Sequence, residues 1–366
     1  MIRPPVIAAA FGGSTPSRRA VLAGGAALAA GPGPVAAATT PAGAEGGRIV
    51  PARFLPVPDT VSPELAKLIA AGIPAGWDAI PADASGWRAL AAASVEAVAP
   101  LLPGIRSSLG LTVERGAIAG VPVFHIAPAA MPEANRDRLL VHLHGGGYVL
   151  FPGEAGAGEG MLLAGHGGFR VVSVDFRMSP DHPFPAPLDD ALAVWKALLS
   201  DHDPRRMGVF GTSSGGGLTF ALMLRLKAEG LPLPAAIAPG SPWVDLTGDG
   251  DSGAANAFVD NALVANSGWA GAAARLYAGA HDLRDPLVSP IHGDFAGLPP
   301  AILTSGTRDL FLSNTVRAHR RLRDAGVEAS LQVFEAQSHA QFLDATIPEM
   351  PVAMREIAAF LSARLA

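Results

Sequence analysis

The sequence predicts an α/β fold with a mostly parallel central sheet and helices on both faces. Short apolar runs alternate with helical segments over most of the chain, which is typical of a parallel sheet that helices cover on both sides. The segment Gly211-Thr212-Ser213-Ser214-Gly215 lies directly between one such run and one such helix. Because ligand sites of these folds lie at the carboxyl ends of the strands, this junction is a candidate functional site.

The apolar runs predict the strands one by one. Two extended runs on either side of Gly120 indicate an antiparallel pair within residues 111–126. The later runs predict strands at residues 139–143, 170–174, 207–210, 235–238, 301–305 and 331–334. Residues 188–199 place Leu188, Leu192 and Trp195 on one helical face, which predicts an amphipathic helix packed on the sheet. Further helices are predicted at residues 63–71, 87–98 and 218–227.

The composition excludes several classes of protein. The chain has 366 residues and no cysteine, which excludes disulfides, thiolate metal sites and a cysteine nucleophile. Its formal net charge is −5 without blocks of like charge, so neither nucleic acid nor an anionic membrane surface is a predicted partner. No apolar run reaches the roughly 18 residues that a membrane-spanning helix needs, and no stable membrane anchor is expected.

The N-terminus resembles a twin-arginine export signal. Arg18 and Arg19 precede a mildly apolar run at residues 20–30, and an Ala-x-Ala pattern at residues 36–38 offers a processing site. Residues 1–38 are therefore predicted to be an export signal, which implies a periplasmic or extracellular protein. The alternative is an Ala/Gly/Pro-rich tail that contains two arginines by chance.

The remainder divides into a linker with an N-terminal cap, residues 39–110, and a main domain, residues 111–366. Between residues 245 and 280 the alternation breaks into a Gly/Asp-rich loop and short helical pieces around Leu263 and Trp269. This break predicts a cap insertion over the site. The aspartates at the start of the insertion lack the spacing of a calcium loop, so no metal site is predicted.

Two motifs indicate acyl-transfer chemistry. Residues 211–215 match G-x-S-x-G, and a sharp turn between strand and helix would expose the oxygen of Ser213, the candidate nucleophile. The segment His144-Gly145-Gly146-Gly147-Tyr148 follows the strand at residues 139–143, and its glycines leave backbone N–H groups open to a substrate oxygen. The predicted oxyanion hole consists of the backbone N–H groups of Gly146, Gly147 and Ser214.

With both motifs, the sequence resembles the hormone-sensitive-lipase-like family of α/β-hydrolases, whose mark is H-G-G-G upstream of the G-x-S-x-G elbow. The resemblance covers roughly residues 112–366 and includes residues 175–177 (DFR) and 182–190 (HPFPAPLDD). It implies an α/β-hydrolase fold with a helical cap, and a catalytic triad in the chain order serine, acid, histidine.

Asp309 and His339 fit that order. His339 follows the strand at residues 331–334 by a short loop, which places the predicted base at a strand's carboxyl end. Asp309 follows the preceding strand in the same way and is the predicted acid, at the place where the family's acid matches. The weaker candidates lie in the cap, in a Pro/Gly loop, before the strand or on a charged helix: His281, His292, His319, Asp282, Asp285, Asp294 and Asp324.

The sequence also departs from the family's pattern. Thr212 and Ser214 stand where the commonest elbow has Asp and Ala, Leu310 stands where Pro usually follows the acid, and Ala340 where Gly is frequent. The oxyanion donor at Ser214 is a backbone N–H, so these departures concern the substrate and leave the reaction class intact.

The combined pattern predicts a serine esterase that cleaves carboxylic esters through an acyl-enzyme. No metal or organic cofactor is required. The expected partner is a small-molecule ester, and the family's capped members imply a short acyl chain. Two alternatives stay open: a lactone or amide hydrolase with the same triad, and a non-catalytic ligand-binding member of the fold. The sequence carries no signal for the oligomeric state.

Overall fold

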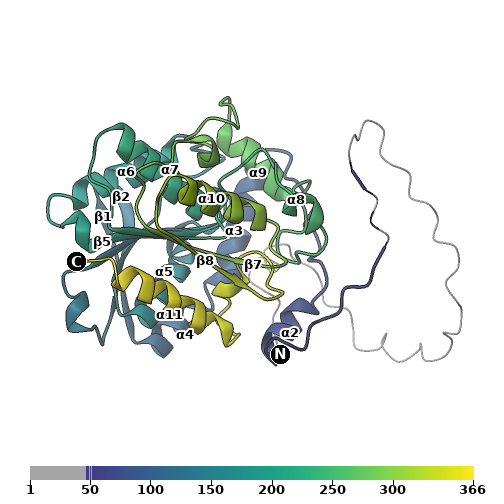
Figure 1. Ribbon diagram of the computed structural model, residues 1–366, viewed down its shortest axis with the longest axis horizontal. Coiled ribbons are helices and arrows are strands. Elements are labelled where there is room, and N and C mark those ends of the chain that lie inside the picture. Colours follow the sequence, from purple (N-terminus) through teal and green to yellow (C-terminus); the bar gives the residue numbers. More distant parts are fainter. Residues whose placement is uncertain (1–46, 49, 51) are drawn as a thin grey trace, which may run out of the picture.

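Figure 1 shows the protein as a computed structural model that describes residues 47, 48, 50 and 52–366. Within these residues one sheet holds eight strands in the order β1-β2-β4-β3-β5-β6-β7-β8. β1 (Leu111–Ile118) pairs antiparallel with β2 (Val121–Pro128), which pairs antiparallel with β4, and the other neighbours are parallel. The predicted fold class is confirmed. The predicted export signal at residues 1–38 lies outside the described residues.

Each apolar run of the sequence forms a strand, with ends that differ from the predicted ones by one or two residues at most. β5 continues past Phe210 because Gly211 and Thr212 pair with Pro239 and Gly240 of β6. The remaining strands are β3 (Leu139–Leu143), β4 (Arg170–Val174), β5 (Met207–Thr212), β6 (Ala236–Gly240), β7 (Ala301–Gly306) and β8 (Ala329–Phe334).

Helices cover both faces of the sheet, with α6, α7 and α10 on one side and α4, α5 and α11 on the other (Figure 1). The helices are α2 (Pro63–Ile69), α3 (Ala84–Val98), α4 (Leu102–Leu109), α5 (Gly158–Gly167), α6 (Ala186–Leu198), α7 (Ser214–Ala228), α8 (Ser252–Ala255), α9 (Trp269–Ala278), α10 (Leu312–Asp324) and α11 (Glu349–Ser362). Short 3-10 turns lie at Glu133–Asn135, Gly153–Ala157, Pro204–Arg206, Pro290–His292 and Gln341–Leu343.

Two hydrophobic clusters fill the two faces, and β3 shows how the strands divide between them. Leu139, Val141 and Leu143 belong to the cluster that includes α6 and α7, whereas Leu140 belongs to the cluster that includes α5 and α11. Side chains alternate between the faces because a strand has a period of two residues. Since both faces are buried, such a strand reads as a continuous apolar run in the sequence.

α6 forms the predicted amphipathic helix. Leu188, Leu192 and Trp195 are buried against the sheet, while Asp189 and Lys196 face solvent. The Trp195 indole N–H donates to the carbonyl oxygen of Pro232 at 3.0 Å, so the buried ring leaves no polar group unsatisfied.

The segment predicted as a cap insertion lies between β6 and β7 and contains α8 and α9. Trp269 begins α9, in agreement with the predicted helical piece there. The helical piece predicted around Leu263 is wrong, because Leu263 lies in an irregular turn. There the Asp260 carboxylate accepts the N–H groups of Ala262 at 2.7 Å and Leu263 at 2.9 Å, and such a side-chain bond competes with helix formation.

In the described part of the chain, no single helix is long and apolar enough to cross a membrane. α3 and α4 pass that test only when they are taken together, with a bend of 41° between them.

Gly211 is expected to tolerate no side chain. A Cβ atom there would overlap the carbonyl oxygen of Leu143, so Gly211→Ala should lower the free energy of unfolding by about 3 kcal/mol or more. Gly104→Ala in α4 is the matched control, because nothing lies within 4 Å of its Cβ position and alanine favours a helix. Urea denaturation measures both. Equal stability of the two variants would contradict the close approach at Gly211.

Candidate active site

Ser213 lies on a sharp turn between β5 and α7. Its backbone has φ 62° and ψ −123°, a left-handed conformation that a non-glycine residue adopts only under constraint. Two hydrogen bonds hold the turn: Ser213 N–H donates to Gly240 O, and Trp243 N–H donates to Ser213 O, both at 2.8 Å. The serine is half-buried at the carboxyl end of β5, so the structure has the strand–turn–helix geometry of a nucleophile elbow.

The glycine-rich loop after β3 lies against this turn. A Cβ atom on Gly145 would come within 2.8 Å of Thr212 O and 3.4 Å of Ser213 Cβ. Gly146 and Gly147 have φ values of 113° and 65°, which favour glycine. The loop thus brings bare backbone next to Ser213, as the sequence predicts.

One of the three predicted oxyanion donors already has an acceptor. The Gly147 N–H donates to Ser214 Oγ at 2.9 Å, and Tyr148 N–H reaches the same oxygen at 3.4 Å. Ser214 is fully buried. Ser214 stands next to the candidate nucleophile, where the family's elbow commonly has alanine. Its side chain therefore makes a contact with the glycine loop that alanine could not make.

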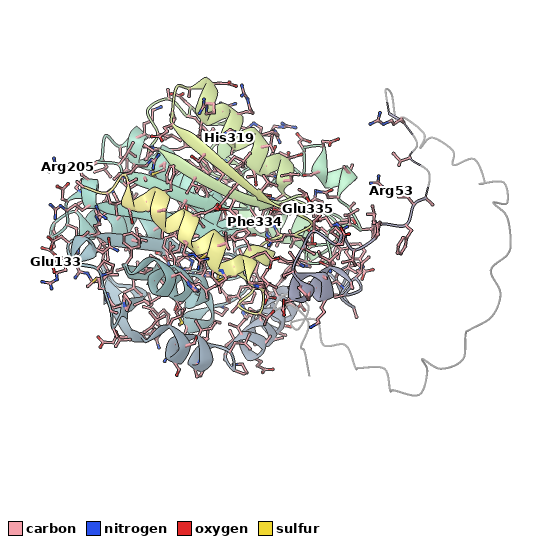
Figure 2. All side chains as sticks on the ribbon, turned by 60° about the horizontal axis from the view of Figure 1, so that its bottom comes forward. Arg53, Glu133, Arg205, His319, Phe334 and Glu335 are labelled. Atoms are coloured by element: carbon pink, nitrogen blue, oxygen red, sulfur yellow. The ribbon has the colours of Figure 1, made fainter. Side chains whose placement is uncertain are left out.

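Asp309 and His339 form a buried pair at the carboxyl ends of neighbouring strands. Asp309 follows β7 and His339 follows β8, whose last residue Phe334 and the next residue Glu335 are labelled in Figure 2. His339 Nδ1 lies 3.0 Å from Asp309 Oδ1. A carboxylate only accepts hydrogen bonds, so Nδ1 carries the proton and Nε2 is left as the basic nitrogen.

Residues 140–343, more than half of the chain, match the family model described as the α/β-hydrolase fold. The chain belongs to this family. A relative, an acetyl-hydrolase of Streptomyces hygroscopicus, is 32% identical over 248 residues, which are 66% of this chain and 81% of that protein.

Solved structures give the same assignment. Esterase E25 superposes with a TM-score of 0.85 and 39% identity, covering 88% of this chain and 100% of that one. An esterase from the bacterial hormone-sensitive lipase family superposes with a TM-score of 0.69 and 30% identity, covering 83% of this chain and 99% of that one. The resemblance of this α/β-hydrolase to the hormone-sensitive-lipase-like family is confirmed.

Several groups stabilise the charge of Asp309. Its Oδ2 accepts from Ser241 Oγ at 2.6 Å and Ser305 Oγ at 2.7 Å, and its Oδ1 accepts from Phe311 N–H at 2.8 Å. Burial alone would raise the pKa of Asp309, but the facing His339 and these hydrogen bonds hold the pKa below its usual value. Sequence reasoning missed both serines, although each lies at or next to a strand's carboxyl end.

A second polar network lies beneath the elbow of this α/β-hydrolase. Glu159 Oε1 accepts from Thr212 Oγ1 at 2.6 Å, and its Oε2 accepts from Thr212 N–H at 3.1 Å. His142 Nε2 lies 3.2 Å from the same Oε2, and its Nδ1 lies 2.9 Å from Ser173 Oγ. Thr212 stands where the commonest elbow has Asp, and it binds the carboxylate of Glu159.

His144 at the start of the glycine loop is buried and neutral. Its ring stacks on Phe176 with centroids 4.3 Å apart, and its Nδ1–H donates to Gly145 O at 2.7 Å. Burial is the main cause that lowers the pKa of His144 to about 4; the Gly145 carbonyl opposes this shift, and neighbouring His142 adds to it. A neutral ring keeps positive charge out of the core below the loop.

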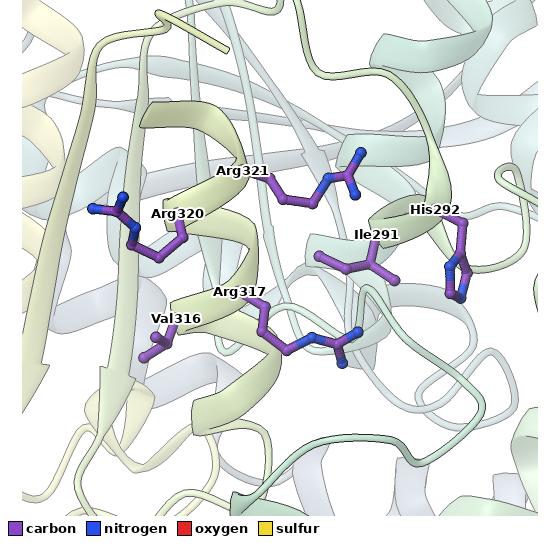
Figure 3. Close-up of a pocket in the computed structure, with 6 residues that line it drawn as sticks. All are labelled: Ile291, His292, Val316, Arg317, Arg320 and Arg321. Carbon is purple, nitrogen blue, oxygen red and sulfur yellow. The ribbon is translucent and has the colours of Figure 1, made fainter. Parts of the chain in front are cut away.

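The weaker histidine candidates lie elsewhere. His319 is on α10 (Figure 2), where its Nε2 lies 3.2 Å from the carbonyl of Ala329, at the opposite end of β8 from the loop of His339. His292 lines a separate pocket of about 290 Å³ (Figure 3), which does not include Ser213, Asp309 or His339.

The arginines of that pocket already have partners: Arg317 pairs with Asp245, Arg320 pairs with Asp324, and Arg321 donates to the Gly293 carbonyl. Nothing in the pocket assigns it a ligand. Across the residues described, no group of three or more His, Asp and Glu side chains is placed to hold a metal ion.

His144 should make the protein less stable in mild acid. Its folded pKa of about 4 lies below the unfolded value of about 6.5, so the unfolded chain binds more protons between these pH values. Stability is therefore fully present above pH 6.5 and falls as pH drops toward 4, by roughly 3 kcal/mol from this residue. Urea denaturation at pH 7 and pH 4 should show that much less loss in His144→Asn than in wild type. Equal losses would contradict the neutral assignment.

Proposed function

We propose that this protein hydrolyses carboxylic esters through a covalent acyl-enzyme. The observation that carries the proposal is the buried Asp309–His339 hydrogen bond at the same sheet edge as Ser213 on its strained turn. The glycine loop beside Ser213 supplies donors for the oxyanion. The acetyl-hydrolase and esterase relatives support the same reaction.

In the proposed mechanism His339 Nε2 takes the proton of Ser213 Oγ as the serine attacks the ester carbonyl. Asp309 keeps the imidazole in this tautomer and stabilises the imidazolium. The backbone N–H groups of Gly146, Gly147 and Ser214 receive the oxyanion, and Gly147 exchanges Ser214 Oγ for the substrate oxygen as its acceptor. His339 then protonates the leaving alcohol, and water hydrolyses the acyl-enzyme through the same base.

We infer that the preferred esters are small, with a short acyl chain. A Cβ atom on Gly147 would lie only 3.0 Å from Cζ3 of Trp269, so the indole packs directly against the glycine loop. Bulk at this point leaves little room beside the reacting carbonyl. The acetyl-hydrolase relative supports the same substrate class.

The lactone or amide hydrolase with the same residues is the second candidate, and it differs only in the leaving group. A non-catalytic ligand-binding role is less well supported, because such a role gives no reason for a charged acid and a histidine to be held in contact in the core.

Replacement of the nucleophile should abolish turnover. Ser213→Ala is expected to lower kcat on p-nitrophenyl acetate by roughly 10⁴- to 10⁶-fold with an unchanged fold. Ser200→Ala, on an exposed turn, is the matched control and should retain full activity. Steady-state rates on acetate, butyrate and octanoate esters should fall with chain length in wild type. Wild-type rates no higher than those of Ser213→Ala would contradict the proposal. Turnover of the octanoate ester faster than that of the acetate ester would contradict the short-chain preference.

We also propose that residues 1–38 direct export through a twin-arginine-type signal, that residues 39–110 form a linker and cap, and that residues 245–280 form the cap insertion. Twin arginines ahead of a short apolar run support the export step.

Cell fractionation tests the export proposal. Wild type is expected outside the cytoplasm, and the double variant Arg18→Lys/Arg19→Lys is expected to stay inside, because the signal requires both guanidinium groups. The control is a variant with substitutions only at Ala44 and Gly46, which lie outside the proposed signal. Equal distribution of wild type and the double lysine variant contradicts the proposal.

A further inference from the structure

Asp260 is a buried carboxylate that the proposed mechanism does not use. It lies in the cap insertion between α8 and α9 and is completely inaccessible to solvent. A buried charge is costly unless hydrogen bonds compensate it, so its partners indicate why it is there.

Its two oxygens accept four backbone N–H groups. Oδ1 binds its own turn through Ala262 and Leu263, at 2.7 and 2.9 Å. Oδ2 accepts from Leu310 N–H at 2.7 Å and from His339 N–H at 3.0 Å. Leu310 is the residue after the proposed acid, and His339 is the proposed base itself. One oxygen atom therefore joins the loop that follows β7 to the loop that follows β8.

The neighbours of Asp260 make the same connection. Asn256 Nδ2 donates to Asp309 O at 2.8 Å. Asn261 N–H donates to Ser338 Oγ at 3.1 Å, and Ser338 Oγ donates back to Asn261 Oδ1 at 2.9 Å. The turn around Asp260, residues 256–263, is called the cap turn. It contacts both the loop after β7 that carries Asp309, the acid loop, and the loop after β8 that carries His339, the base loop. Asp260 is the side chain that binds both loops.

The contacts of Asp260 are those of an ionised carboxylate, because all four partners are donors and a protonated carboxyl would turn an O–H toward one of them. Burial raises the pKa of Asp260 and the charge of Asp309 raises it further, while His339 and the backbone N–H groups oppose that rise. His339 is therefore held by two buried carboxylates: Asp309 binds its ring Nδ1, and Asp260 binds its backbone N–H.

We propose that Asp260 is a positioning residue of the active site: its carboxylate fixes the position of the acid loop relative to the base loop, so that Asp309 contacts His339 Nδ1. This inference rests on the esterase proposal. The cap insertion then does more than cover the site, because one of its turns holds two members of the triad in place.

The test compares Asp260→Asn with Asp245→Asn. Asparagine at 260 is isosteric, but it has a single acceptor oxygen. Its NH2 group must therefore face either the N–H pair of Leu310 and His339 or that of Ala262 and Leu263, donor against donor, so the link between the cap turn and the two loops is broken on one side. Asp245 is equally buried, and its oxygens bind Thr247 and Arg317 instead of the triad loops, so it is the matched control. Asp260→Asn should lower kcat on p-nitrophenyl acetate about 100-fold with KM within about threefold, as a misplaced triad does. Asp245→Asn should keep kcat within about threefold.

Two further measurements separate positioning from general destabilisation. In a His339→Ala background, Asp260→Asn should have no further effect on the residual rate, because residues that act as a unit are not additive. Amide hydrogen exchange at Leu310 and His339 should be at least about tenfold faster in Asp260→Asn than in wild type and unchanged in Asp245→Asn. If Asp260→Asn does not fold, Asp260→Ser replaces it, since the smaller side chain leaves room for a water acceptor.

An unchanged kcat in Asp260→Asn, an equal loss in Asp245→Asn, a full effect in the His339→Ala background, or unchanged exchange at both amides would each overturn the inference. Failure of the esterase proposal is distinguishable, because wild type and Ser213→Ala would then be equal in rate. The exchange measurement needs no substrate and still decides whether Asp260 joins the two loops.

Discussion

The site depends on one close contact, in which the backbone around Gly211 and Gly215 lies against the carbonyl of Leu143. A Cβ atom on either glycine would overlap that oxygen. β3 and β5 are paired neighbours, so the contact brings the end of one strand over the end of the other. The close approach of these two strand ends therefore places the nucleophile turn against the glycine loop.

A second constraint is the charge of Asp309 in the core. Its carboxylate is compensated by groups from three neighbouring strand ends: Ser241 after β6, Ser305 on β7 and His339 after β8. Parallel strands present their carboxyl ends at one edge, so the same topology that exposes the serine also gathers the donors that an ionised acid needs. The carboxylate of Asp309 is thus bound by groups at three strand ends and by one N–H of its own loop.

The sequence was sufficient for the sheet and for the placement of Ser213, Asp309 and His339 at the carboxyl ends of strands, because both follow local rules. Buried parallel strands are apolar runs, and Ser213, Asp309 and His339 each follow one at a short distance. It was insufficient for Asp260 and Ser241, because the partners of their side chains at the site lie 50 or more positions away in the chain and leave no local pattern. Ser305 lies only four positions before Asp309, but a serine at the end of an apolar strand does not by itself indicate a hydrogen bond to an acid. The expected helix at Leu263 was wrong for the same reason: the backbone there bonds to a side chain that also binds two distant loops.

The residues on either side of Ser213 differ from those of the commonest elbow, and each contacts a different part of the site. Thr212 Oγ1 donates to Glu159, which also contacts the buried His142. Ser214 Oγ instead accepts the Gly147 N–H. Neither substitution removes a backbone donor. The Ser214 hydroxyl nevertheless gives Gly147 an internal acceptor that an alanine could not offer. In the proposed mechanism a substrate carbonyl displaces that acceptor, so the benefit from this donor is the difference between two hydrogen bonds and not one whole bond. In the same proposal the site discriminates between esters by how well the carbonyl oxygen replaces the hydroxyl, which favours substrates whose carbonyl reaches the loop without hindrance from Trp269.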